Sequence, residues 1–140
     1  MGELFKAKDL MKVVTNGEKP PNCDLTLQIQ AKYAYEGIAR GIWQVDEKFI
    51  NGIGVAMGGF VASAADIMMA YAIASKLQNN QSFASIDLHT TFHKPIFQGE
   101  VLVEAKVDRM GKQIAYVLAD LYQKDKKVAS AVSSVILIND

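Results

Sequence analysis

Residues 51–75 form a glycine-rich turn followed by an almost wholly apolar stretch, in which Asp66 is the only charged side chain. A helix that is apolar on every side has to be buried on every side, so other elements must cover it. An unpaired carboxylate in such a place costs several kcal/mol or is neutralised by a pKa shift. Asp66 therefore has partners, faces a cavity or takes part in chemistry, unless it lies at a solvated edge of the helix.

The segments on both sides of this stretch predict the strands that cover it. Residues 25–49 are strand-like, with a turn at Glu36-Gly37 and a second strand through residues 41–45. Turn sequences then separate four strand candidates, at residues 83–94, 99–109, 113–124 and 127–138. We therefore expect an α+β fold, in which an antiparallel sheet of about six strands wraps around one long central helix from about Met57 to Leu77.

The length of 140 residues predicts a single domain that buries roughly two-thirds of its unfolded surface. Within it, residues 1–24 are expected to form a helical lead-in, over Glu3 to Val14, and a loop. Fifteen Lys and Arg balance fifteen Asp and Glu, so no net field favours a nucleic-acid partner. The lone Cys23 excludes an intramolecular disulfide and a cysteine metal cage.

The N-terminus lacks the uninterrupted apolar core of a signal peptide, which predicts a cytoplasmic protein. The apolar stretch after Gly58 has the length of a short membrane span, but Asp66, Ser63 and many small residues make a buried core helix the better prediction, with no membrane partner.

Alternation along residues 83–94 predicts that the even positions from Ala84 to Phe92 face the core, and that Ser85 lies on the other face with both histidines. His89 and His93 would be about 13 Å apart along a strand, which is too far for one metal ion. We expect no metal, and we expect solvent or a subunit interface around the histidines.

This order of elements resembles the hotdog fold. The spacing of Asn51, Gly54, Gly58-Gly59 and Asp66 resembles the motif of the phenylacetate-degradation (PaaI-like) type of acyl-CoA thioesterases. Residues 83–100 resemble that family's next signature, a serine before an alternating strand and a Pro-x-x-x-Gly turn, and the resemblance spans about residues 28–138. One departure is Met57, because family members commonly have histidine before the glycine pair.

The resemblance implies a role for each motif residue. The Gly58 amide is expected to be the main oxyanion donor, at a helix N-terminus that favours negative charge. Asp66 of one subunit would face that site in another, as general base on water or as nucleophile. Asn51 would orient the water or the acid, and Ser85 would hydrogen-bond either one. Coenzyme A would enter only as part of the substrate, with no bound cofactor, and the protein would be a homodimer or homotetramer.

The residues themselves leave alternatives open. Gly58-Gly59 can be only a tight turn, Asn51 an ordinary loop residue and Ser85 a solvated strand residue. Met57 favours a non-catalytic acyl-CoA binder as an alternative to the hydrolase. A hotdog hydratase or dehydratase is a third reading, weakened because residues 58–77 contain no histidine. Some basic residues at predicted turns could hold coenzyme A phosphates, although turns are usually polar in any case: Arg109, Lys112, Lys124, Lys126 and Lys127.

Overall fold

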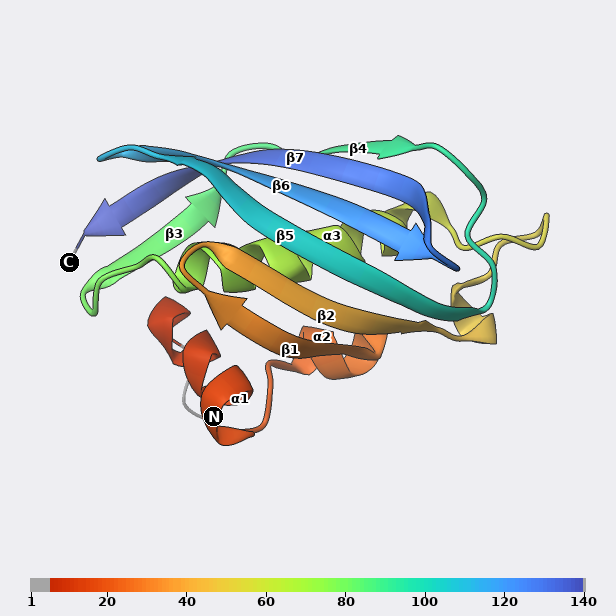
Figure 1. Ribbon diagram of the computed structural model, residues 1–140, viewed down its shortest axis with the longest axis horizontal. Helices are drawn as coiled ribbons and strands as arrows, with labels where there is room; N and C mark the ends of the chain where they lie inside the picture. The colour runs from red at the N-terminus through yellow and green to blue at the C-terminus, as the bar shows by residue number, and fades with distance from the viewer. Residues whose placement is uncertain (1–5, 140) are drawn as a thin grey trace.

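The computed structural model describes residues 6–139 and consists of one curved antiparallel sheet packed around one long helix (Figure 1). The elements are η1 (Ala7–Asp9), α1 (Leu10–Asn16), α2 (Asn22–Leu27), β1 (Ile29–Tyr35), β2 (Ile38–Val45), η2 (Glu47–Phe49), α3 (Gly58–Ala74), β3 (Gln81–Ser85), β4 (His89–Phe92), β5 (Gly99–Met110), β6 (Ile114–Gln123) and β7 (Lys126–Asn139). The strand order is β1-β2-β5-β6-β7-β3, and β4 also pairs with β7. The expected α+β architecture is confirmed.

The long helix α3 forms the centre of the core, because its apolar side chains face strands on several sides. It is rich in alanine and methionine, which favour helix, and it packs against β1, β2, β5, β6 and β7. Its side chains of Met68, Tyr71 and Ile73 are fully buried, as is Trp43 from β2. β2, which precedes α3 in the sequence, pairs directly with β5, which follows it.

The hairpin between β1 and β2 is tied to the C-terminal end of α3. The turn lies at Glu36-Gly37, as expected, and both residues have positive φ, 48° and 83°. The Gly37 amide donates to the Ser75 hydroxyl oxygen at 2.7 Å, and that hydroxyl donates to the Ala72 carbonyl at 2.7 Å. These bonds fix the sheet against the helix at the end opposite Gly58.

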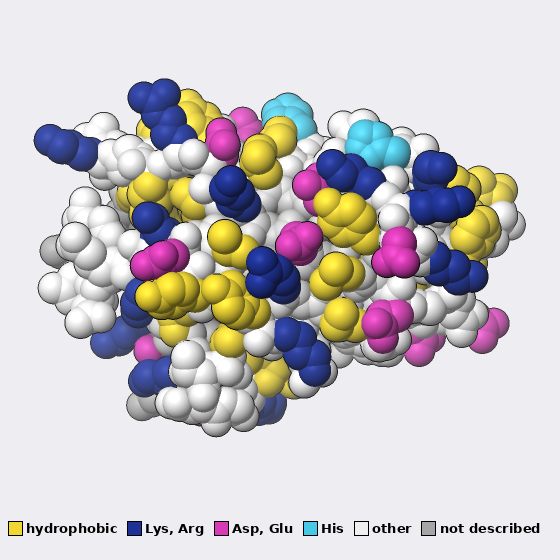
Figure 2. All heavy atoms as spheres, viewed as in Figure 1, with side chains coloured by type: hydrophobic (Ala, Val, Ile, Leu, Met, Phe, Trp, Pro, Cys, Tyr) yellow, Lys and Arg dark blue, Asp and Glu magenta, His cyan; other side chains and the backbone are white. Residues whose placement is uncertain are grey.

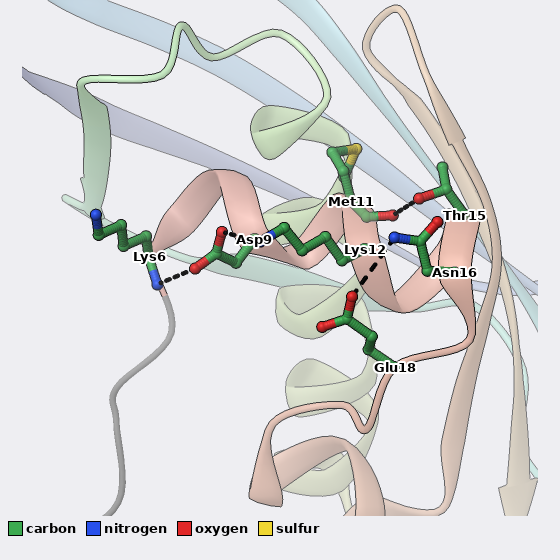
Figure 3. Close-up of polar contacts among 7 residues, drawn as sticks. All are labelled: Lys6, Asp9, Met11, Lys12, Thr15, Asn16 and Glu18. Atoms are coloured by element: carbon green, nitrogen blue, oxygen red, sulfur yellow. Dashed lines mark hydrogen bonds and ion pairs between the residues drawn. The ribbon is translucent and has the colours of Figure 1, made fainter.

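The N-terminal lead-in is helical over residues 7–16, which agrees with the expectation for most of the described residues. The Lys6 amide donates to the Asp9 carboxylate at 3.3 Å, and Asp9 pairs with Lys12 at 3.5 Å (Figure 3). The hydroxyl of Thr15 donates to the Met11 carbonyl at 2.9 Å, one turn back (Figure 3). These short-range contacts hold η1 and α1 together, and the predicted residues 3–5 lie outside the described part.

The expected strand beginning at residue 25 is wrong at its start, because residues 22–27 form α2. The buried positions there have helical spacing: Asp24 and Leu27, three residues apart, are both buried, while Leu25 is exposed. The Tyr71 hydroxyl of α3 donates to Asp24 at 2.6 Å, and Trp43 Nε1 donates to the Leu27 carbonyl at 3.0 Å. These bonds anchor α2 to the core.

Asp24 is almost completely buried, and its titration reflects that environment. Desolvation by burial raises the pKa of its carboxyl above the usual value, against the opposing effect of the hydrogen bond from Tyr71. The neighbouring Cys23 thiol also has a raised pKa, chiefly through burial and the closeness of Asp24. A raised thiol pKa means a less reactive cysteine, consistent with an inert structural residue.

The strand expected at residues 83–94 is divided into β3 and β4, which both pair with β7. The interruption lies at Asp87, whose carboxylate accepts from the Ser134 amide at 2.8 Å while its carbonyl accepts from the Ser133 hydroxyl at 2.7 Å. The side chain of Asp87 thus takes over a backbone position in the ladder. The strands at the C-terminal half otherwise lie within a few residues of the expected boundaries.

The surface mixes charged and apolar side chains, as Figure 2 shows for one face. Apolar residues on the outer side of the sheet, including Tyr116 and Val132, are exposed. Within residues 6–139 no helix has the length and hydropathy needed to span a membrane.

Candidate active site

The N-terminus of α3 presents two backbone amides without an acceptor. Met57 precedes the helix in an extended conformation, and its carbonyl accepts from the amides of Phe60 and Val61 at 3.0 and 3.2 Å. Within residues 6–139 the amides of Gly58 and Gly59 donate to no protein group. Such unpaired N–H groups at a helix start, together with the helix dipole, attract negative charge.

Gly58 opens into a groove of about 380 Å³, whose other wall is the segment from Phe92 to Ile96. The ring of Phe92 lies directly against Gly58: a Cβ at position 58 would be 2.9 Å from the Phe92 Cζ atom. Only glycine allows this approach without displacement of the ring. Phe92 is nevertheless 55% exposed, so the groove is open on one side.

Asp66 lies on the side of α3 that the chain's own sheet leaves uncovered. It is exposed, as are Gly59 and Ser63 on the same stripe, while Ala62 and Ala70 are half-buried. Ile73, seven residues after Asp66 on the same helix, is fully buried in the core.

Asp66 forms no hydrogen bond or ion pair with another described residue, unlike Ser63, whose hydroxyl donates to the Gly59 carbonyl at 2.9 Å. Desolvation by surrounding protein atoms raises the pKa of the Asp66 carboxyl above its usual value. A carboxylate with a raised pKa and no partner is a stronger base than an ordinary surface aspartate.

One chain does not bring Asp66 and the Gly58 amide together. Eight residues of α-helix separate them, which is about 12 Å along the helix axis at 1.5 Å per residue. A base has to approach within about 3 Å of the proton that it takes, directly or through one water. The two groups therefore cannot act on one small reacting centre from within the same helix.

Asn51 organises the loop that leads to α3. Its side-chain oxygen accepts from the amides of Ile53 and Val55, at 3.0 and 3.2 Å. Its carboxamide nitrogen donates to no described residue, so one donor group remains available. The loop role is therefore present, and the expected role in orienting water or acid stays a prediction.

Ser85 is the last residue of β3, where it pairs with Val135 and is exposed. Its hydroxyl contacts no hydrogen-bond partner within residues 6–139. The expected inward face of residues 84–92 is wrong for a single chain: Ile86, Leu88 and Phe92 are exposed, because the break at Asp87 interrupts the alternation.

Met57 and the histidines complete the surroundings. The Met57 side chain is 45% exposed, and its Cε atom lies beside Gly59, 3.2 Å from where a Cβ would stand. His93 Nε2 lies 2.8 Å from the Ser130 hydroxyl, and His89 lies 3.8 Å from the Asp87 carboxylate. Among residues 6–139 no three His, Cys, Asp or Glu side chains are arranged to hold a metal ion.

Sequence reasoning missed two features here, the contact of Phe92 with Gly58 and the buried Asp24–Tyr71 bond. The pairing of a small residue with an aromatic ring from a distant strand leaves no local signal. An isolated acid at Asp24, three residues before Leu27 in a short apolar run, was the available signal for the second.

Comparison with known proteins identifies the relatives of this architecture. A family model described as thioesterase superfamily matches residues 53–130. A candidate esterase of Pseudomonas aeruginosa is 33% identical over 89 residues, which cover 63% of this chain and 66% of that protein, just under two thirds of its length.

Two solved structures have the same fold. A phenylacetic acid degradation-related protein of Ralstonia eutropha superposes with a TM-score of 0.85 at 21% identity, over 91% of this chain and 98% of that one. The PaaI protein from the Escherichia coli phenylacetic acid degradation operon gives a TM-score of 0.75 at 27% identity, over 81% of this chain and 86% of that one. The expected resemblance and the hotdog fold are confirmed.

Proposed function

The chain belongs to the thioesterase superfamily, and on this premise we propose that it is a thioester hydrolase. Its proposed substrate is an acyl-CoA, which it hydrolyses to a carboxylic acid and free coenzyme A. The observation that carries this proposal is the unpaired amide of Gly58, a residue that lines an open groove at the start of α3. No cofactor is needed for the reaction, because water is the second reactant.

The Gly58 amide is the proposed donor to the carbonyl oxygen of the thioester. When water adds to the carbonyl carbon, negative charge develops on that oxygen, and a donor that is already oriented stabilises it without reorganisation. Gly58 suits this role because its amide is free and its missing side chain leaves room beside Phe92.

Asp66 is the proposed general base, with attack on the carbonyl as nucleophile as the alternative role. As base, its carboxylate takes a proton from the attacking water, and the C–S bond then breaks as the thiolate takes up that proton. The raised pKa of Asp66 supports this role, since a base that binds protons more strongly removes them more readily. Asn51, through its free carboxamide nitrogen, and Ser85 are the proposed partners of the water or the acid.

A second copy of the chain is part of the proposal. The separation of about 12 Å along α3 requires that the Asp66 acting at one Gly58 belongs to another subunit. The uncovered stripe of α3 and the exposed apolar side chains of Ile86 and Leu88 supply surface for such a partner. We expect a homodimer or homotetramer by light scattering, and a fully active monomer would contradict the shared site.

Release of free thiol from a panel of acyl-CoAs tests the function. The hydrolase releases one thiol for each thioester consumed. A non-catalytic binder would retain the unhydrolysed acyl-CoA, and a hydratase would alter the acyl chain without release of thiol. Retention of an intact acyl-CoA over hours, with no thiol released by the wild type or by Met57→His, would favour the binder.

A further inference from the structure

A basic pocket lies beside the Gly58 groove, at the end of the sheet where the β6–β7 turn meets the segment before β5. Its volume is about 450 Å³, and its lining includes the side chains of Lys94, Lys124 and Lys126 but no acidic residue. Figure 1 shows the β6–β7 turn beside the segment that leads into β5, at the right-hand end of the molecule. A concave site of this size with converging charges fits part of a small-molecule ligand.

The three lysines are available for a ligand. None of them forms an ion pair with another residue in the described part of the chain, whereas the adjacent Lys127 pairs with Asp120 at 3.4 Å. The whole chain has no net charge, so this positive cluster is a local feature and not the consequence of a basic protein. Three unpaired ammonium groups around one hollow attract a multiply charged anion.

The pocket has a fixed frame. Gln123 forms two hydrogen bonds with the backbone of Phe97, accepting from its amide at 3.0 Å and donating to its carbonyl at 2.7 Å. The Lys94 amide donates to the Val128 carbonyl at 3.1 Å. Lys124 and Asp125 form a tight turn with positive φ, which sets the direction of the β6–β7 hairpin. The lysines therefore project from anchored backbone.

The pocket and the Gly58 groove share a wall, because Lys94 and Pro95 line both. One extended molecule can therefore occupy the two, with its reacting group at Gly58 and its anionic group among the lysines. Phe97 also lines the basic pocket and is 55% exposed, so it offers an open aromatic surface. Aromatic surfaces of this kind stack with nucleobases.

We infer that Lys94, Lys124 and Lys126 bind the phosphate groups of coenzyme A, with Phe97 against the adenine, and that they select a free coenzyme A thioester over a carrier-protein thioester. This inference rests on the proposed function and adds the residues that recognise the part of the substrate far from the reaction. A carrier protein presents its thioester on a phosphopantetheine arm that has one phosphodiester and no nucleotide. The 3′-phosphate and the adenine are therefore the groups that distinguish the two substrates.

The experiment compares the wild type with Lys94→Gln, Lys124→Gln, Lys126→Gln and the triple variant that combines these substitutions. Lys127→Gln, from the same hairpin, is the matched control. Each protein is assayed with an acyl-CoA, the acyl-dephospho-CoA without the 3′-phosphate, an S-acyl pantetheine and an acyl carrier-protein thioester. Binding of adenosine 3′,5′-bisphosphate is measured by calorimetry, independently of turnover. Circular dichroism verifies that each exposed substitution leaves the fold intact.

We expect the triple variant, and at least one of the single pocket variants, to raise KM for acyl-CoA by about tenfold or more with kcat unchanged. A tenfold change in KM corresponds to the loss of about one charge-assisted hydrogen bond. Their kcat/KM with S-acyl pantetheine should not change, and Lys127→Gln should match the wild type with every substrate. Wild-type protein should bind adenosine 3′,5′-bisphosphate, and the triple variant should not.

Unchanged KM for acyl-CoA in the triple variant would overturn the inference, and so would faster hydrolysis of the carrier-protein thioester than of acyl-CoA. Hydrolysis of acyl-CoA with no dependence on the lysines leaves the proposed function standing while the pocket assignment fails. If no thioester were hydrolysed, the proposed function would fail, and the calorimetry would still decide whether the lysines bind the nucleotide.

Discussion

Replacement of Gly58 by proline removes one hydrogen-bond donor at a place that otherwise accepts proline. Gly58 is the first residue of α3, where proline is common in helices because the amide there has no partner within the helix. Met57, with φ −64° and ψ 136°, already has the extended conformation that a residue before proline prefers. We therefore expect Gly58→Pro to fold as the wild type does.

Its activity should nevertheless fall sharply. If the Gly58 amide is the main oxyanion donor, its loss removes about 2.7–4 kcal/mol of transition-state stabilisation, or about 10²–10³-fold in kcat. The measurement is thiol release at saturating acyl-CoA, with thermal unfolding followed by circular dichroism to establish that the variant is folded.

Gly58→Ala is the control for the added carbon atoms. It keeps the N–H group and places a Cβ atom 2.9 Å from the Phe92 ring, the same approach that proline makes. Because Phe92 is largely exposed, its ring can turn away, and we expect the alanine variant to lose less than about tenfold in kcat. Equal kcat values for folded Gly58→Pro and Gly58→Ala would refute the assignment of the Gly58 amide as the main donor.

Three further substitutions test the acid, the buried pair and the packing. Asp66→Asn should lower kcat by about 10²-fold or more, while the control Asp108→Asn, at an exposed position, should keep normal turnover. Stability of Asp66→Asn at neutral pH should be unchanged or increased, because desolvation disfavours the charged form of Asp66. Near-native kcat in folded Asp66→Asn protein would show that Asp66 is only a structural residue. Because the folded-state pKa of Asp24 is raised, its contribution to stability is complete below about pH 3.9 and is lost as the pH rises through the raised value. Denaturation midpoints should therefore fall more steeply with rising pH in the wild type than in Asp24→Asn. Parallel pH profiles would contradict this. Gly41→Ala places a Cβ atom 2.6 Å from Met68 Sδ and 2.9 Å from the Gln30 carbonyl oxygen. This substitution should lower the free energy of unfolding, measured by urea titration, by about 1–3 kcal/mol. The control Gly52→Ala, whose Cβ atom would have nothing within 4 Å, should leave the free energy of unfolding almost unchanged.

Strong local patterns carried most of the fold prediction. The almost wholly apolar run after Gly58 predicted the start of α3 to within one residue, because a segment of this length that is apolar on every side is typical of a buried helix. The turn at Glu36-Gly37 and the polar turns of the C-terminal half predicted the hairpins, since those residue types are the ones that tolerate the required backbone. The three long strands at the C-terminus therefore lie close to their predicted positions.

The failures occur where tertiary contacts override local pattern. Leu25 to Leu27 alternates like a strand, but the buried bond from Tyr71 to Asp24 and the contact of Trp43 with Leu27 stabilise a helix there. Phe92 was assigned to the core by alternation, yet it lies exposed against Gly58, since its neighbours come from a helix far along the chain. The expected meeting of Asp66 of one subunit with Gly58 of another stays a prediction, because a single chain holds the two residues about 12 Å apart along α3.

The strands that cover α3 lie both before and after it in the sequence, which has a consequence for synthesis of the chain. Residues 58–74 are made before residues 99–139, which supply the three long strands of their cover, and β2 has to wait for β5 before the sheet can close across the helix. At 5–20 residues per second, the ribosome needs roughly 3 to 13 seconds to add the 65 residues between Ala74 and the end of β7 at Asn139. During that interval the nascent chain exposes its most apolar segment to water, which makes this stage of synthesis the one at which chaperone binding protects it from aggregation.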